Sequence, residues 1–271
     1  MQTLSRLALV ALFATLSTAC TTQRETPVTN TYGTLSDGTT ANLYTLTNAN
    51  GLTATVTDFG ATLVSVSTPD RDGNLADITI GYDTLDGWVN DGSYMGATVG
   101  RYGNRIANGK FTLNDTEYTL ATNNDPNHLH GGTVGFNKKM WSAQRIHPID
   151  GDGVQFTYVS PDGEEGYPGQ LTSVVTYTLN NSDELVINFE ATTTAPTVVN
   201  IVHHTYWNLT GDPAQKILDH KLMLLADGYT PIDETSIPNN GIQPVEDTPF
   251  DFRSATAIGK RIDDNNEQLK N

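Results

Sequence analysis

Cysteine and basic side chains are scarce in this chain of 271 residues. Its single cysteine, Cys20, excludes a disulfide within the chain and a zinc site built from several thiolates. The 15 Lys and Arg residues stand against 31 Asp and Glu residues, which gives a formal charge of −16. This excess of negative charge argues against nucleic acid as a partner, because phosphate binding needs concentrated Lys and Arg.

Long apolar runs with helical periodicity are also absent after residue 20, and short runs with period-two alternation take their place. Such alternation is typical of half-buried strands. It is clearest in residues 52–56, 154–159 and 185–189, and on both sides of Asn114-Asp115, where a hairpin turn is predicted. The 24 Gly and 12 Pro lie mostly between these runs, as turns require. We therefore expect one all-β domain, a sandwich or a barrel, over residues 31–271.

The first residues have the layout of a secretory signal. Arg6 supplies a positive charge, residues 7–16 are almost wholly apolar, and small residues precede Cys20. Cys20 stands where a bacterial lipoprotein carries its lipid, so residues 1–20 predict a signal peptide with lipidation at Cys20. The alternatives are ordinary cleavage of the signal peptide and its retention as a membrane anchor. The polar residues 21–30 are typical of a tether. We expect an exported protein, periplasmic or tethered to the outer membrane of a bacterium, with membrane contact only through the lipid.

Four of the six histidines form two close pairs. His128 and His130 flank one leucine before two glycines, so they either share one face of a strand or straddle a turn made by the glycines. His203 and His204 are adjacent, so on a strand only one of them points into a given pocket. Imidazole titrates near neutral pH, which suits proton donation and removal. The alternative is that these are hydrogen-bonded structural histidines.

The spacing of His128 and His130 also resembles the start of a cupin metal site. A metal site of that kind needs a carboxylate soon after the histidines, and residues 131–139 contain none. We therefore predict no metal centre.

Residues 100–106 combine turn glycines with Arg101, Asn104 and Arg105 in a chain that is otherwise poor in arginine. Guanidinium and amide groups suit the recognition of sugar hydroxyls, which accept and donate hydrogen bonds at fixed angles. Ion pairing on an acidic surface is an equally good interpretation of this segment alone.

Other residues carry weaker signals. Glu164 and Glu165 have the composition of a glycosidase acid and base, but adjacent carboxylates in a glycine-rich loop are usually solvated. Trp141, Tyr206 and Trp207 suit stacking on a sugar face, although a single aromatic residue is more often part of a core.

Taken together and in this order, five segments resemble the aldose 1-epimerase (galactose mutarotase) family. They are residues 100–110, 127–141, 160–169, 204–209 and 226–253. The resemblance implies the fold of that family, a large antiparallel β-sandwich of the galactose mutarotase-like supersandwich type. It also implies a free aldohexose such as galactose or glucose as the substrate, and interconversion of its α and β anomers without cofactor or metal.

In that family a base takes the proton of the C1 hydroxyl and an acid protonates the ring oxygen. The ring opens to an aldehyde, the C1–C2 bond rotates, and the ring recloses with the roles reversed. By motif, His204 matches the general acid, and His130 matches the second active-site histidine, which hydrogen-bonds the sugar. Asn104, Arg105 and Tyr206 match sugar-contacting positions.

One part of the family pattern has no match. In the family, the catalytic Glu and an Asp that holds the sugar lie beyond the segment that matches Arg253. No Glu of this sequence stands in the motif of the catalytic Glu, and Glu267 is the nearest to it by position. We expect a truncated mutarotase that carries the acid but not the base, with the last strands of the sandwich missing. A sugar-binding module without turnover is the alternative, and a domain that accompanies glycoside hydrolases is a weaker one.

Overall fold

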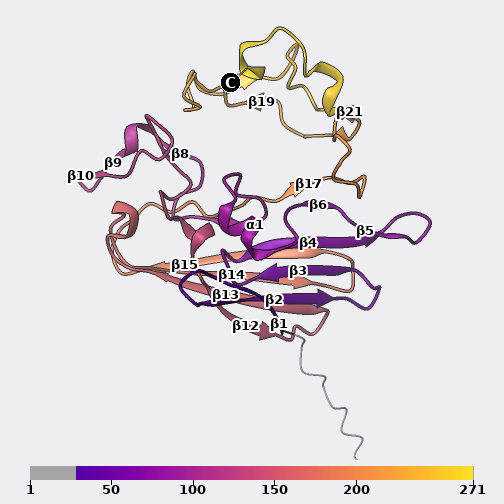
Figure 1. Cartoon of the computed structure of the whole chain (residues 1–271). Helices are drawn as coiled ribbons and strands as arrows, with labels where there is room; N and C mark the ends of the chain where they lie inside the picture. The colour runs from indigo at the N-terminus through magenta and orange to yellow at the C-terminus, as the bar shows by residue number, and fades with distance from the viewer. Residues whose placement is uncertain (1–28, 271) are drawn as a thin grey trace, which may run out of the picture.

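Two antiparallel sheets form the body of the protein (Figure 1). The computed structural model describes residues 29–270, so the predicted signal peptide, the lipidation site Cys20 and most of the tether 21–30 lie outside the described residues. The first sheet contains β1 (Thr29–Thr34), β2 (Thr40–Thr47), β3 (Thr53–Thr57), β4 (Thr62–Pro69) and β5 (Leu75–Asp77), in sequence order. The second sheet contains β12 (Ser142–Ile146), β13 (Asp152–Ser160), β14 (Leu171–Leu179) and β15 (Leu185–Thr193), also in sequence order.

The core lies between these two sheets. Leu46 and Val56 of the first sheet are fully buried in one cluster with Phe156, Val175 and Tyr177 of the second. Along β14 every second residue is buried, as the period-two pattern predicts. The antiparallel β-sandwich expected from the sequence is confirmed, and the three predicted runs lie in or across β3, β13 and β15.

Short strand pairs extend from one side of the sandwich and carry the segments singled out in the sequence (Figure 1). They pair β6 (Thr79–Ile80) with β17 (Tyr206–Trp207), β7 (Thr98–Val99) with β16 (Val202–His203), β8 (Arg105–Ile106) with β11 (His128–Leu129), and β9 (Lys110–Leu113) with β10 (Thr116–Thr119). The β9–β10 hairpin turns at Asn114 and Asp115, both at positive φ, which confirms the predicted hairpin. Helix α1 (Leu85–Asn90) and the 3₁₀ turns η1 (Ala107–Gly109), η2 (Phe136–Lys138) and η3 (Glu164–Gly166) connect these elements.

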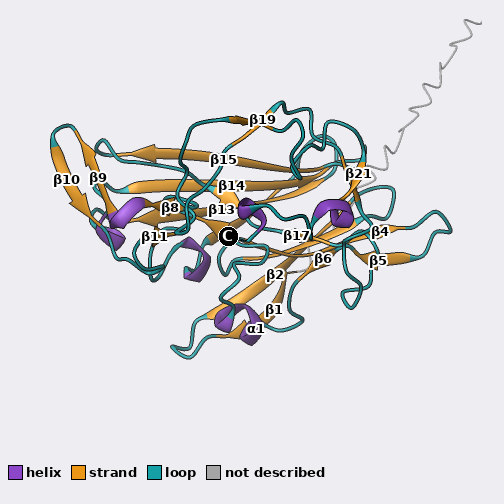
Figure 2. Ribbon diagram, turned by 90° about the horizontal axis from the view of Figure 1, so that it is seen from above, coloured by secondary structure: helices purple, strands orange, loops and turns teal. Residues whose placement is uncertain are grey.

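The C-terminal part of the described chain is rich in loops. It contains the pairs β18 (Lys221–Leu222) with β21 (Thr256–Ala257) and β19 (Gly228–Tyr229) with β20 (Gln243–Pro244), followed by the 3₁₀ turns η4 (Ile258–Arg261) and η5 (Glu267–Leu269). In Figure 1 this part is the orange-to-yellow layer on the far side of β6 and β17, and in Figure 2 it lies above the sheets. None of the helices in residues 29–270 has the length and apolar character that crossing a membrane requires.

The loop between β13 and β14, residues 161–170, ties the sandwich to the short strand pairs, and we call it the brace loop. The hydroxyl of Tyr167 lies 2.6 Å from Nε2 of His128 on β11, and both side chains are fully buried. Nδ1 of His128 lies 2.7 Å from the carbonyl of Ala121, which only accepts, so Nδ1 carries the proton and Nε2 accepts from Tyr167. The guanidinium of Arg101 is also buried, and it donates to the carbonyls of Pro168 and Gly169.

Because the Tyr167–His128 hydrogen bond is fully buried, its loss leaves an acceptor without a partner. Tyr167→Phe is expected to lower the free energy of unfolding by about 1–3 kcal/mol, measured by urea denaturation. Tyr118→Phe is the control, since no hydrogen bond of the Tyr118 hydroxyl is present within residues 29–270. Equal stability of the two variants would contradict this role of Tyr167.

Candidate active site

His130 and Asn104 are joined by two reciprocal hydrogen bonds. The backbone N–H of Asn104 donates to Nδ1 of His130 over 2.8 Å, and the backbone N–H of His130 donates to the carbonyl of Asn104 over 3.0 Å. The antiparallel pairing of β8 with β11, with Arg105 opposite Leu129, brings the two residues together. Since Nδ1 is an acceptor, a neutral His130 ring carries its proton on Nε2 and presents an N–H donor there.

The backbone of this pair is left-handed. Asn104 has a φ of 65° and His130 a φ of 52°, a region that few residue types other than glycine enter and in which asparagine and histidine are enriched. This conformation turns the chain at the end of each short strand. It is the local reason why the side chain of His130 does not follow the strand alternation that places His128 in the core.

Burial, together with the nearby charges of His204 and Arg105, lowers the pKa of His130 to about 4. The ring is therefore neutral at physiological pH, as the hydrogen bond to Nδ1 also requires. A neutral imidazole with a free Nε2–H is a hydrogen-bond donor for a sugar oxygen.

His204 lies against His130. Their ring centroids are 5.2 Å apart and the ring planes are nearly perpendicular, at 86°. Two hydrogen bonds fix the backbone of His204: its N–H donates to Ala97 and its carbonyl accepts from Gly96, each over 3.0 Å. The sequence-predicted pair of His130 and His204 is thus brought together from segments that are far apart in the chain.

Two tyrosines complete this cluster of rings. The centroid of Tyr206 is 5.3 Å from that of His204, and Tyr94 lies 4.6 Å from His130 and 6.0 Å from His204. Tyr206 is 41% exposed, and its hydroxyl is 3.4 Å from the carbonyl of Ser93. Sequence reasoning missed Tyr94, because no motif surrounds it and only the fold places it beside the two histidines.

Arg105 lies beside these rings with its guanidinium held by amides. Its Nε–H donates to Oδ1 of Asn124 over 2.9 Å, and Nη1 is 3.4 Å from Oδ1 of Asn104. In the part of the chain that the structure describes, Arg105 forms no ion pair with a carboxylate, although acidic residues outnumber basic ones. The remaining N–H groups of Arg105 are therefore available to a ligand with hydroxyl oxygens.

Comparisons with known proteins show the family of the chain. The family model described as aldose 1-epimerase matches residues 42–271. The chain belongs to the aldose 1-epimerase family. It is 45% identical over 213 residues to the galactose mutarotase of Mus musculus and 38% identical over 236 residues to the aldose 1-epimerase of Escherichia coli (strain K12).

These matches cover 79% and 86% of this chain, respectively, but 61% and 67% of the relatives. The chain therefore spans about three fifths of the length of the mouse relative, at 61%. Its fold is similar to the crystal structure of galactose 1-epimerase from Lactobacillus acidophilus NCFM, with a TM-score of 0.81 and 30% identity. That likeness covers 90% of this chain and 71% of the other.

His128 and His203, the other two histidines of the two pairs, pack inside the protein. His128 is buried with both ring nitrogens hydrogen-bonded inside the protein, so it does not share a face with His130 and cannot join it as a metal ligand. Within residues 29–270 no three or more His, Cys, Asp and Glu side chains form a group that could hold a metal ion.

His203 points away from His204, as the alternation of a strand predicts. Its ring lies 5.7 Å from that of the buried Tyr177, and Nδ1 is 3.1 Å from the hydroxyl of Thr205. Burial and the neighbouring His204 lower the pKa of His203 to about 4.

The structure also decides between the alternatives left open for residues 100–106 and for the tryptophans. Of the two arginines in residues 100–106 only Arg105 lies at the site, since Arg101 is buried against the brace loop. Trp141 is 3% exposed and donates to a backbone carbonyl, so it belongs to the core and not to a stacking surface, whereas Trp207 is 43% exposed.

The paired glutamates are occupied by the protein. Glu164 forms an ion pair with Lys139 at 2.7 Å and accepts from Tyr158 over 2.8 Å. Glu165 accepts two backbone N–H groups, from Thr133 and from the residue after it. Both carboxylates are thus engaged in structural contacts, which removes the glycosidase interpretation.

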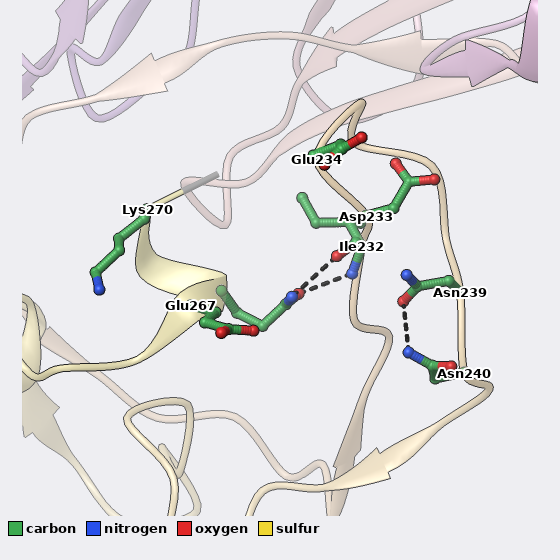
Figure 3. A pocket seen from close by; sticks show the side chains of 8 residues that line it. Ile232, Asp233, Glu234, Asn239, Asn240, Glu267 and Lys270 are labelled. Carbon is green, nitrogen blue, oxygen red and sulfur yellow. Dashed lines mark hydrogen bonds between the residues drawn. The ribbon is translucent and has the colours of Figure 1, made fainter.

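Glu267 lies in a pocket apart from the histidines. The pocket has a volume of about 370 Å³, and Glu267 shares it with Asp233, Glu234 and Lys270, among others, but with no histidine (Figure 3). Beside it the side chain of Gln268 is hydrogen-bonded to both backbone groups of Ile232. The structure therefore does not bring the candidate base Glu267 together with His130 and His204.

The depressed pKa values of the half-buried His130 and His203 predict a pH-dependent stability. Between the usual pKa of 6.5 and the folded value of about 4, the unfolded chain binds protons that His130 and His203 in the folded protein do not. The urea midpoint is therefore expected to fall as the pH drops from 7 to 5. In His203→Phe the dependence on pH should be weaker than in the wild type, and an identical slope would contradict the assignment.

Proposed function

We propose that this chain binds free aldohexoses such as galactose and glucose and acts in the interconversion of their α and β anomers. The observation that carries the proposal is the juxtaposition of His130 and His204, 5.2 Å apart between ring centroids, beside Arg105 with no carboxylate partner among the described residues. The names of the relatives, galactose mutarotase and aldose 1-epimerase, support the same substrate class.

Each residue has a role that its contacts allow. His204 is the general acid, which protonates the ring oxygen as the C1–O5 bond breaks and takes the proton back when the ring recloses. His130 donates its Nε2–H to the sugar, because its Nδ1 is occupied by the backbone of Asn104. Arg105 and the exposed Asn104 bind hydroxyls, and the exposed ring of Tyr206 forms part of the wall.

The reaction also needs a base for the proton of the C1 hydroxyl. The three glutamates considered from the sequence do not supply it, since Glu164 and Glu165 are engaged in structural contacts and Glu267 lies in another pocket. A sugar-binding module without turnover, which has the same binding site, is the second candidate function.

Polarimetry of freshly dissolved α-D-galactose separates the two candidates. If the chain is an epimerase, it accelerates the decay of optical rotation, and His204→Ala abolishes the acceleration because the acid is lost. His147→Ala is the control, since this exposed histidine lies outside the site. A fully active His204→Ala protein would contradict the role of His204.

Calorimetric titration with galactose tests the binding site in either case. Arg105→Ala is expected to raise the dissociation constant at least about tenfold, equivalent to about 1.4 kcal/mol, because the guanidinium supplies charge-assisted hydrogen bonds. Saturable binding without acceleration would support the sugar-binding module. Absence of saturable galactose binding would contradict both candidate functions.

We also propose that the protein is exported and anchored by a lipid on Cys20. Arg6, the apolar residues 7–16 and the small residues before Cys20 support this proposal. In a bacterial host Cys20→Ser is expected to move the protein from the membrane fraction to the soluble periplasmic fraction and to abolish labelling by a radioactive fatty acid. Unchanged membrane association of Cys20→Ser would contradict the lipid anchor.

A further inference from the structure

The segment that carries His130 has an unusual backbone. His130, Gly131 and Gly132 have consecutive positive φ values of 52°, 86° and 116°. A Cβ on Gly131 would lie 1.8 Å from the carbonyl oxygen of Gly100, so the segment is pressed against the neighbouring chain. Because a left-handed histidine is unfavourable by itself, contacts from the surrounding protein have to hold the segment in place.

Polar side chains supply these contacts on both sides of the segment. The side-chain amide of Asn123 spans the segment, since its nitrogen donates to the carbonyl of Leu129 before His130 and to that of Gly132 after it, each over 3.0 Å. Directly after Gly132, the backbone N–H groups of Thr133 and Val134 donate to the carboxylate of Glu165, over 2.9 and 3.1 Å. Each N–H contacts a different oxygen of this carboxylate.

The carboxylate of Glu165 also lies directly on Gly132. A Cβ at that position would be 2.1 Å from Oε2, so only glycine lets the carboxylate approach the backbone this closely. Within residues 29–270 Glu165 forms no ion pair. Its two oxygens serve the His130 segment instead of a basic side chain.

Glu165 is itself held by the brace loop. Tyr167, two residues further along, is hydrogen-bonded to His128, which precedes His130 by two residues. The loop that carries the carboxylate is therefore tied to β11, the strand that leads into the segment around His130.

We propose that Glu165 is a positioning residue for the sugar site, whose carboxylate holds the His130 segment so that the Nε2–H of His130 points at the ligand. The proposal rests on the proposed function, in which His130 donates to the sugar. Without the carboxylate, the N–H groups of Thr133 and Val134 turn to water and the segment gains other conformations. The contact between Asn104 and Nδ1 of His130 is then made only part of the time.

The test uses Glu165→Ala and Glu165→Gln, with Glu164→Gln as the control from the same loop. We expect Glu165→Ala to raise the galactose dissociation constant about tenfold, or about 1.4 kcal/mol. Glu165→Gln should have a smaller effect, because its amide oxygen still accepts one N–H. Glu164→Gln removes the ion pair with Lys139 but no contact with the segment, so its dissociation constant should stay within about twofold of the wild-type value.

An NMR titration of the His130 ring without ligand gives an independent readout. His204, Arg105 and Tyr94 are the titratable and charged groups that face this ring. In Glu165→Ala we expect the pKa of His130 to rise from about 4 toward 6.5, as the ring loses burial and its Nδ1 contact. Loss of a negative charge by itself would lower the pKa of a histidine, so a rise separates positioning from a simple charge effect.

Unchanged galactose affinity and an unchanged His130 titration in Glu165→Ala would overturn the proposal. Equal effects of Glu164→Gln and Glu165→Gln would overturn it too, since they would show that only the integrity of the loop matters. If Glu165→Ala does not fold, the comparison of galactose dissociation constants between Glu165→Gln and Glu164→Gln tests the proposal instead. If the wild type binds no galactose, the proposed function fails, and the titration of His130 still decides whether Glu165 positions the ring.

Discussion

The hydrogen bond from the backbone of Asn104 to Nδ1 of His130 is the contact on which the candidate site depends. It fixes the position of the ring and leaves the proton of the neutral ring on Nε2. It also ties the two short strands β8 and β11 at their ends, which places Arg105 beside His130. The same turn that forms this contact separates His130 from the buried His128, so one backbone conformation decides which of the two histidines is available to a ligand.

The sandwich supports this contact through buried polar groups. Short strand pairs of two residues have few ladder hydrogen bonds of their own, so side chains from the brace loop supply the rest. Three sets of hydrogen bonds connect β13 and β14 to the site: Tyr167 bonds to His128, Glu165 to the backbone after His130, and Arg101 to the carbonyls of the brace loop. Groups of this kind are costly to bury without partners, and with partners they specify one arrangement of the chain.

The distribution of charge supports the proposal of a neutral, hydroxyl-rich ligand. The chain is strongly acidic, yet Arg105 is held by the uncharged side chains of Asn104 and Asn124. The carboxylates of Glu164 and Glu165 near the site accept from a lysine, from hydroxyls or from backbone N–H groups. This arrangement leaves guanidinium and imidazole N–H groups for a ligand's oxygens, and it fits the membership in the aldose 1-epimerase family.

The sequence by itself determined the local elements and the family. Period-two alternation, the Asn114-Asp115 turn and the ordered motifs around His130 and His204 predict the antiparallel sandwich and the pair of histidines. Only the tertiary structure decided which neighbours serve the site and which serve the core. Arg101 is buried, Glu165 holds a backbone segment, and Tyr94 packs beside the two histidines. The physical reason is that these environments come from contacts between residues far apart in the chain, and no local pattern records such contacts.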